Sequence, residues 1–202
     1  MTVYIIGGSP CSGKSTVAQA MAEQYGLHYF KVDDHLDRYM QMGAAQGKAC
    51  CAAVAHMSPE EIWMRAPQVQ CAEELQIYRE IYGYILQDLE PLATGHDVIT
   101  EGAAYLPALV REQGVPFCRY LSITPTKEFQ VLHYRRREWV PHVLEGCSDK
   151  TAAFSNWMER DALFAEAVRR QCSALGYASL VNNGSTSVDE LIHRAAAHFG
   201  LE

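Results

Sequence analysis

The feature that most constrains this 202-residue chain is a run of small residues near its start, Gly8-Ser9-Pro10-Cys11-Ser12-Gly13-Lys14-Ser15-Thr16. An apolar run typical of a buried strand precedes it at Thr2–Ile6, and apolar residues at helical spacing follow it over Ser15–Tyr25. In such a strand–loop–helix unit, successive backbone N–H groups can surround phosphate oxygens where glycines keep side chains away. The start of the helix adds free N–H groups and the positive end of its dipole. The pattern therefore predicts a phosphate-binding loop, here named the phosphate loop, over Gly8–Thr16.

Two residues at the end of the phosphate loop carry its expected chemistry. The spacing is Gly-x-x-x-x-Gly-Lys-Ser without a mismatch, which is typical of proteins that bind a nucleoside triphosphate. Lys14 is expected to reach the β- and γ-phosphates, and the Ser15 hydroxyl to coordinate Mg²⁺. We therefore expect ATP and Mg²⁺ as cofactors. The alternative is a plain glycine turn followed by an exposed lysine.

The rest of the chain alternates between strand and helix patterns, which favours one α/β domain over residues 1–202 with a parallel sheet between helices. Gly43–Met57 has no clear pattern, whereas Ser58-Pro59-Glu60-Glu61 is typical of a capped helix start. We expect residues 43–90 to form a helical insertion that selects the acceptor, and residues 138–150 to form a lid. Further strands are predicted over His28–Val32, Asp97–Thr100, Phe117–Ile123 and Ala178–Val181, and further helices over His35–Met42, Gln70–Leu89, Thr126–Trp139, Thr151–Leu175 and from Ser187 onward.

Acidic residues follow the second and third predicted strands, at the edge of a parallel sheet where ligands bind. Asp33 is expected to accept the proton of an attacking hydroxyl, and both Asp33 and Asp34 to contact the acceptor. The alternative is that the pair caps the helix beginning at His35. Glu101 is expected to contact Mg²⁺ or the substrate, and Gly102 to let the backbone approach a ligand; a solvated acid at a strand end is the alternative.

Several arginines can supply the positive charge that phosphoryl transfer requires. Arg135, Arg136 and Arg137 lie at the stem of the predicted lid, and because helical neighbours point in different directions, only some can reach one ligand. Arg65 and Arg160 are further candidates for substrate binding. For all five, a surface ion pair or a favourable position near a helix end is the alternative.

Composition excludes several classes of protein. The chain has 24 acidic and 17 basic residues and a net charge of −7, which argues against nucleic acid as a partner. No apolar run approaches the roughly 20 residues of a membrane span, and the residues before the phosphate loop do not resemble a signal peptide. Seven cysteines without a Cys-x-x-Cys pair indicate reduced thiols and a cytoplasmic location. The sequence indicates no oligomeric state.

These motifs together make the chain resemble the P-loop small-molecule kinases, the group that contains shikimate, gluconate, adenylate and cytidylate kinases and chloramphenicol phosphotransferase. The resemblance implies a three-layer fold whose five-stranded parallel sheet has the order 2-3-1-4-5, with Asp33 as base or acceptor anchor. It also implies that the tail around Asn183 forms the loop on the adenine side of the nucleotide. The chain departs from the group in two ways: Glu101 stands where aspartate is commoner, and the insertion matches no known substrate-binding domain. The resemblance rests on Gly7–Thr16, Val32–Asp34, Glu101–Gly102, Arg135–Arg137 and Val181–Ser185.

The sequence therefore favours an ATP-dependent kinase that phosphorylates a hydroxyl or phosphate group of a small molecule. A regulatory nucleotide-binding NTPase is an alternative, although the Asn-Lys-x-Asp and Asp-x-x-Gly motifs of GTPases are absent. A toxin-like or nucleic-acid-end kinase is a second alternative, which the acidic charge disfavours. A non-catalytic relative is a third, which the intact Lys14 and Ser15 disfavour.

Overall fold

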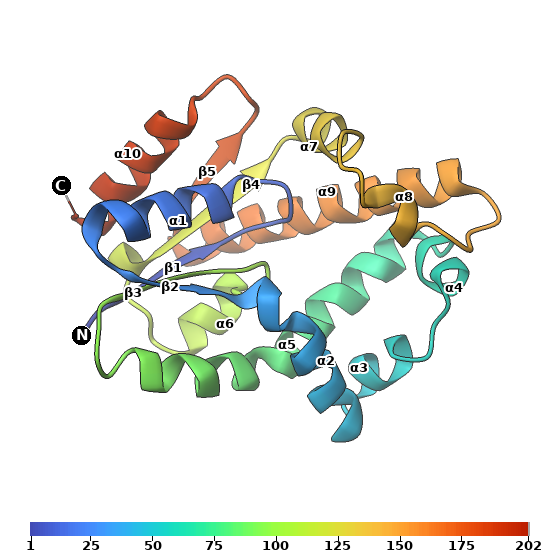
Figure 1. Cartoon of the computed structure of the whole chain (residues 1–202), viewed down its shortest axis with the longest axis horizontal. Helices are drawn as coiled ribbons and strands as arrows, with labels where there is room; N and C mark the ends of the chain where they lie inside the picture. The colour runs from blue at the N-terminus through green and yellow to red at the C-terminus, as the bar shows by residue number, and fades with distance from the viewer. Residues whose placement is uncertain (202) are drawn as a thin grey trace.

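The computed structural model of the protein describes residues 1–201, and its centre is one sheet of five parallel strands. The order across the sheet is β2-β3-β1-β4-β5, which confirms the α/β architecture and the strand order that the sequence predicts (Figure 1). All neighbouring strands are parallel, so every strand ends at the same edge of the sheet. The strands are β1 Val3–Gly7, β2 His28–Lys31, β3 Val98–Glu101, β4 Tyr120–Pro125 and β5 Ala178–Asn182.

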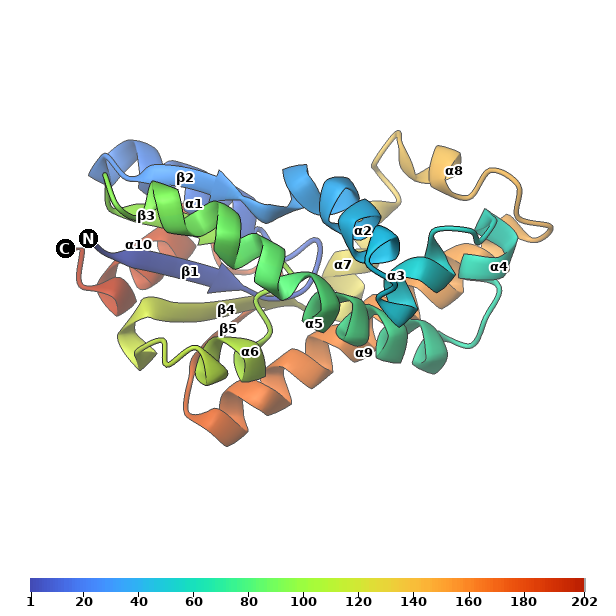
Figure 2. The same ribbon diagram turned by 90° about the horizontal axis from the view of Figure 1, so that it is seen from below.

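Helices cover both faces of the sheet because the buried strands carry apolar residues on both sides. On β1, Tyr4 and Ile6 pack in the core formed with α1 (Lys14–Tyr25) and α10 (Val188–Phe199). Ile5, between them, packs in the larger core on the opposite face. That face is covered by α5 (Pro67–Leu92), α6 (Pro107–Glu112) and α9 (Lys150–Leu175), which lie in front of the sheet in Figure 2.

The insertion and the lid gather beyond the edge at which the strands end (Figure 1). The insertion begins with the short turn η1 (Val32–His35) and contains three short helices before α5. The lid segment carries a further short helix and packs on α9 through a third apolar cluster around Trp157. This cluster includes Tyr134 and Leu144, and Trp63 packs against it. The short helices are α2 Leu36–Ala45, α3 Ala49–Val54, α4 Pro59–Trp63, α7 Lys127–Tyr134 and α8 Val140–Val143.

Several predicted boundaries are wrong. The helix predicted over Thr126–Trp139 is α7 and ends at Tyr134, and a new helix, α8, starts at Val140 with a proline in its first turn. Pro141 has no N–H to donate to Arg137, so a continuous helix would lose a hydrogen bond there. The strand predicted from Phe117 begins at Tyr120, after a short 3-10 turn, η2 (Phe117–Arg119).

The structure also contains helices that no prediction named. Helix α6 lies between β3 and β4, and α3 lies within Gly43–Met57, the segment without a clear pattern. The predicted capping box at Ser58 is confirmed, because the Ser58 side chain accepts from the Glu61 N–H and the Glu61 side chain accepts from the Ser58 N–H. Within residues 1–201, no helix combines the length and apolar character that crossing a bilayer requires.

Candidate active site

The phosphate loop has a backbone conformation that only certain residues adopt. Gly8 has φ +123°, and a Cβ there would lie 1.8 Å from the carbonyl oxygen of Ile123, so no other residue fits. Gly13 has φ +91° and occupies the N-cap of α1, immediately before Lys14. Cys11, with φ +60°, is the only residue other than glycine with a positive φ in the described part of the chain. The loop therefore passes directly from β1 to the start of α1, where free N–H groups favour an anion.

Lys14 and Glu101 form a buried ion pair beside the phosphate loop. The Lys14 Nζ lies 3.7 Å from Glu101 Oε2, and the two residues are 4% and 0% exposed. The Glu101 Oε1 accepts a hydrogen bond of 3.1 Å from the Tyr29 hydroxyl. Burial raises the pKa of Glu101, and the charge of Lys14 opposes that rise. Sequence reasoning missed Tyr29, because a tyrosine within a strand carries no signal of a role at the site.

The residues around Glu101 fit a magnesium ion. Its Oε2 is buried without a hydrogen-bond partner, and the Ser15 side chain lies within hydrogen-bond reach of the same carboxylate. A hydroxyl and a carboxylate oxygen are ligands that Mg²⁺ accepts, together with water and phosphate oxygens. Among residues 1–201 no group of three or more His, Cys, Asp or Glu residues could hold a metal. An ion here would thus take its remaining ligands from phosphate and water.

A cavity of about 320 Å³ opens around the phosphate loop and the first turn of α1. Phe129 and His133 of α7 form one part of its wall, with ring centroids 4.1 Å apart. Val188 and Leu191 of α10 line it as well. The cavity therefore offers an anion-binding end at the phosphate loop and a wall of aromatic and apolar side chains, as a nucleotide requires.

Asn182, the last residue of β5, holds the phosphate loop in place through its side chain. Its Nδ2 donates a hydrogen bond of 3.0 Å to the Ser12 carbonyl, and its side chain lines the cavity. Asn183, the residue proposed from the sequence, is exposed and accepts hydrogen bonds from the N–H and hydroxyl of Ser185 within a turn. The rule that sites form at the carboxyl ends of strands could have indicated Asn182.

The two aspartates after β2 lie on the turn η1, and neither caps a helix. The N-cap of α2 is His35, which makes no side-chain capping bond, so the capping alternative for Asp33 and Asp34 is wrong. Asp34 is exposed and bonds to the Lys31 Nζ at 2.6 Å. Asp33 is also exposed and lies close enough to Glu101 to raise the pKa of that carboxyl.

The three consecutive arginines differ in position. Arg137 is half-buried and lines the cavity, with its guanidinium carbon 4.7 Å from the centre of the Tyr134 ring and 5.4 Å from that of Trp139. Arg135 and Arg136 are exposed at the end of α7. Only Arg137 of the three is thus near the phosphate loop, at the junction between α7 and the lid.

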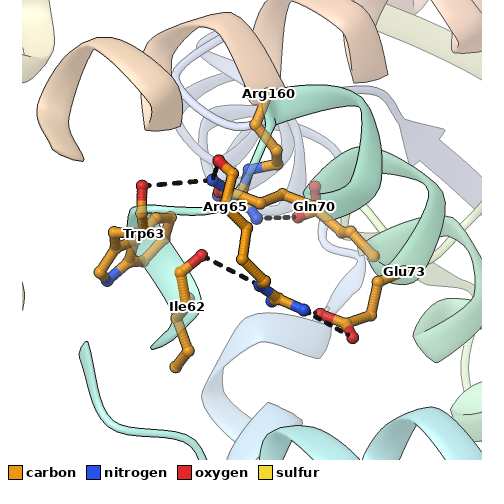
Figure 3. A network of polar contacts seen from close by, with 7 residues as sticks. Ile62, Trp63, Arg65, Gln70, Glu73 and Arg160 are labelled. Atoms are coloured by element: carbon orange, nitrogen blue, oxygen red, sulfur yellow. Dashed lines mark hydrogen bonds and ion pairs between the residues drawn. The ribbon is translucent and has the colours of Figure 1, made fainter. Parts of the chain in front are cut away.

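The other two arginines already have carboxylate partners. Arg160 of α9 is half-buried, with its Nη1 3.1 Å from Glu74 and its Nε 2.7 Å from Asp161. Arg65 makes a bidentate contact with Glu73, at 3.1 and 2.7 Å, and both arginines face the same region of the insertion (Figure 3). They lie apart from the residues that line the cavity at the phosphate loop.

Gly102 packs against the protein itself. A Cβ at this position would lie 2.7 Å from the Cβ of Val32, so glycine is required for β3 to pass the start of η1. Its N–H donates to the Ile6 carbonyl, which ties the end of β3 to β1. These contacts account for the glycine without a ligand.

Two of three comparisons with known proteins find no match. No model of a known protein family matches the chain, and no curated protein matches it. Among solved structures, it is similar to one described as a "putative kinase" from Chloroflexus aurantiacus J-10-fl, at 17% identity over 98% of this chain and 97% of that one. At a TM-score of 0.41 this likeness is too distant to bear on function, and the fold rests on the order of the strands.

Proposed function

We propose that the protein is an ATP-dependent phosphotransferase that moves the γ-phosphoryl group to a small molecule. The observation that carries the proposal is the buried contact between Lys14 and Glu101 at the phosphate loop, where the Glu101 Oε2 lies 3.7 Å from the Lys14 Nζ and has no hydrogen-bond partner. Buried polar atoms without partners are rare, and one beside an anion-binding loop indicates a missing ligand. Magnesium held with a nucleoside triphosphate would satisfy it.

The cavity at the phosphate loop would bind the nucleotide. Backbone N–H groups of the loop and the Lys14 ammonium would contact the β- and γ-phosphates. Phe129 and His133 offer a surface for a planar base, and Asn182 holds the loop at Ser12. Ser15 and Glu101 would hold the magnesium ion, which neutralises charge on the β- and γ-phosphates.

The transfer step requires a base and further positive charge. As the acceptor oxygen forms its bond to the γ-phosphorus, the bond from that phosphorus to the bridging oxygen of ADP breaks, and ADP leaves. The hydroxyl proton of the acceptor would pass to the carboxylate of Asp33, which lies on η1 directly after β2. Arg137, at the wall of the cavity, would stabilise the charge on the transferred group.

The proposal is tested by measuring nucleotide binding and acceptor-dependent ADP formation in the same preparation. Isothermal titration calorimetry with Mg·ATP is expected to show one site, and ADP formation is expected to rise when an acceptor is added. The acceptors are nucleosides, nucleotides, sugar acids and amino alcohols. Failure of Mg·ATP to bind, or ADP formation that no acceptor changes, contradicts the proposal.

A further inference from the structure

A second cavity of about 180 Å³ lies within the insertion, between α2, α3, α4, α5 and α9. None of its lining residues also lines the cavity at the phosphate loop. Two observations nevertheless connect the two regions. Asp33 raises the pKa of both Glu101, at the phosphate loop, and Glu74, in the second cavity. Cys11 of the phosphate loop packs in the same apolar cluster as Trp63 of α4. Most of the wall is apolar, formed by Leu36, Met40, Val54, Ile62 and Ile77.

The charged donors of this second cavity already contact carboxylates of the protein. The Arg65 guanidinium donates twice to Glu73 and once to the Ile62 carbonyl. The Gln70 Nε2 donates to the carbonyls of Trp63 and Arg65, as Figure 3 shows. The remaining donors contact carboxylates: Tyr78 donates to Glu74 at 3.0 Å, and Arg160 lies between Glu74 and Asp161. A phosphate or carboxylate entering here would have to displace one of these bonds.

Two hydrogen-bond acceptors of the cavity, in contrast, have no partner. They are the Gln70 Oε1 and the Glu74 Oε2, on side chains that line the cavity and belong to residues only 4% and 9% exposed. An unpaired buried acceptor destabilises the folded chain, more so when it is charged, and a ligand that donates to it recovers that free energy. Because the Gln70 Nε2 donates to two carbonyls, the end of the amide without a partner is its oxygen, Oε1.

The charges in and around the second cavity favour a cation. Its lining includes the carboxylates Asp37, Glu73 and Glu74 against the two guanidiniums Arg65 and Arg160. Asp161, fully buried behind them, contacts Arg160 as well and so leaves Glu74 incompletely neutralised. An ammonium group is the complement of a buried carboxylate oxygen in such a place.

We infer that this second cavity binds the phosphoryl acceptor and that the acceptor is a small amino alcohol with an apolar body. The assignment of the second cavity as the acceptor site rests on the proposed function. The apolar wall holds the body, the Glu74 and Gln70 oxygens accept from the ammonium group, and the hydroxyl faces Asp33. Nucleoside monophosphates and sugar acids are disfavoured, because the guanidiniums of Arg65 and Arg160 already contact carboxylates of the protein.

Binding of such a compound depends on pH. Burial raises the pKa of Glu74 to about 7, with Asp161 and Asp33 adding to the rise and Arg160 and the Tyr78 hydroxyl opposing it. A bound ammonium favours the ionised carboxylate, so binding releases a proton and strengthens from pH 6 to pH 8.

Direct binding without nucleotide tests the inference. The probes are small aryl and alkyl amino alcohols, among them 2-amino-3-phenylpropan-1-ol, each paired with the hydroxy acid of the same skeleton, such as 3-phenyllactate. Calorimetry at pH 8 is expected to show that at least one amino alcohol binds and that its hydroxy acid binds more weakly. The inference is overturned if no amino alcohol binds or if the hydroxy acids bind at least as tightly. Because no ATP is present, this result is independent of whether phosphoryl transfer occurs.

Two variants locate the binding. Glu74→Gln keeps an Oε1 that can accept from Arg160 and Tyr78 and removes the charge, so binding of the amino alcohol is expected to weaken at least about tenfold. Val54→Phe narrows the cavity and is expected to abolish binding while leaving Mg·ATP binding unchanged. The matched control is Glu166→Gln, an exposed position on α9 whose change is expected to have no effect. Amino alcohol binding that survives both Glu74→Gln and Val54→Phe, with circular dichroism showing folded chains, contradicts the inference.

Discussion

Lys14 and Glu101 illustrate how much of the candidate site depends on single buried charges. Each is almost fully buried, and the Lys14 Nζ lies 3.7 Å from the Glu101 Oε2. The raised pKa of Glu101 shows that burial outweighs the attraction of Lys14. Such a pair adds little to the free energy of unfolding, because the free-energy cost of removing two charges from water is about as large as their mutual attraction.

Replacing Lys14 is expected to abolish transfer while the fold survives. Lys14→Met preserves most of the buried volume and removes the charge that would contact the β- and γ-phosphates, so turnover should fall at least about 100-fold. Steady-state ADP formation measures the effect, and circular dichroism with thermal unfolding controls for the fold. Wild-type turnover in a folded Lys14→Met chain would contradict the proposed mechanism.

Asp33 and Asp34 form a matched pair for testing the base. Asp33→Asn is expected to lower kcat about 100-fold or more with little change in ATP affinity, because a base acts only in the transition state. Asp34→Asn should have little effect on kcat, since this exposed residue bonds to Lys31. An equal loss of ATP binding in Asp33→Asn would assign Asp33 to the metal instead.

Asn182 and Asn183 make a second matched pair. Asn182→Ala removes the hydrogen bond to the Ser12 carbonyl and should weaken Mg·ATP binding about fivefold, the effect of about 1 kcal/mol. Asn183→Ala is expected to change only the local turn. Calorimetric titration of both variants provides the measurement, and a larger effect at Asn183 would favour the assignment made from the sequence.

Elements whose signals are local could be predicted from the sequence. The strand before the phosphate loop, the helix after it and the capping box at Ser58 each depend on neighbours in the chain, and all three are present. The alternation of strand and helix patterns predicted the parallel sheet, and the order of its strands followed from the resemblance to a known group.

Elements held by distant residues could not be predicted. The N–H groups of Cys50 and Cys51 at the start of α3 donate to the carboxylate of Glu80 on α5, at 3.1 and 3.0 Å. No local pattern indicates a cap that comes from another helix. The pairing of Arg65 with Glu73 and of Arg160 with Glu74 is equally invisible in the sequence, because it depends on how α4, α5 and α9 pack.

Glycines within elements differ in their tolerance of a side chain. Gly83→Ala, in the exposed interior of α5 with no atom within 4 Å of the added Cβ, should stabilise the protein by about 0.5–1 kcal/mol. Gly8→Ala places a Cβ 1.8 Å from the Ile123 oxygen at a positive φ and should cost at least about 4 kcal/mol. Urea unfolding of both variants checks the pair, and a stable Gly8→Ala chain would contradict the geometry of the phosphate loop.

The molecule as a whole has one cavity at the phosphate loop, at the edge where the strands end, and a second cavity in the insertion. Buried carboxylates lie near both cavities: Glu101 at the phosphate loop, Glu74 in the insertion and Asp161 on α9. Burial is the first cause of a raised pKa in all three. The proposed transfer needs both cavities, which the fold brings together by inserting α2 to α5 between β2 and β3.

Stability should therefore depend on pH through Glu74. Its folded-state pKa, raised from the usual 4.5 to about 7, means that the folded chain holds this proton more tightly than the unfolded chain. The contribution is favourable at low pH and is lost as pH rises from about 4.5 through 7. Glu74→Gln should thus gain stability relative to wild type between pH 5 and pH 8, measured by urea unfolding. A difference that stays constant with pH, as expected for Glu166→Gln, would show that the pKa of Glu74 is not raised.

The fate of the γ-phosphoryl group of ATP tests the central claim most directly. The chain is incubated with Mg²⁺ and ATP labelled at the γ-phosphate, together with a mixture of amino alcohols, nucleosides and sugar acids, and the label is followed by chromatography. We predict that the label moves to an organic phosphate, that the same label remains in ATP with Lys14→Met, and that little inorganic phosphate forms. Label that is released only as inorganic phosphate, at a rate that no acceptor changes, would contradict a phosphotransferase.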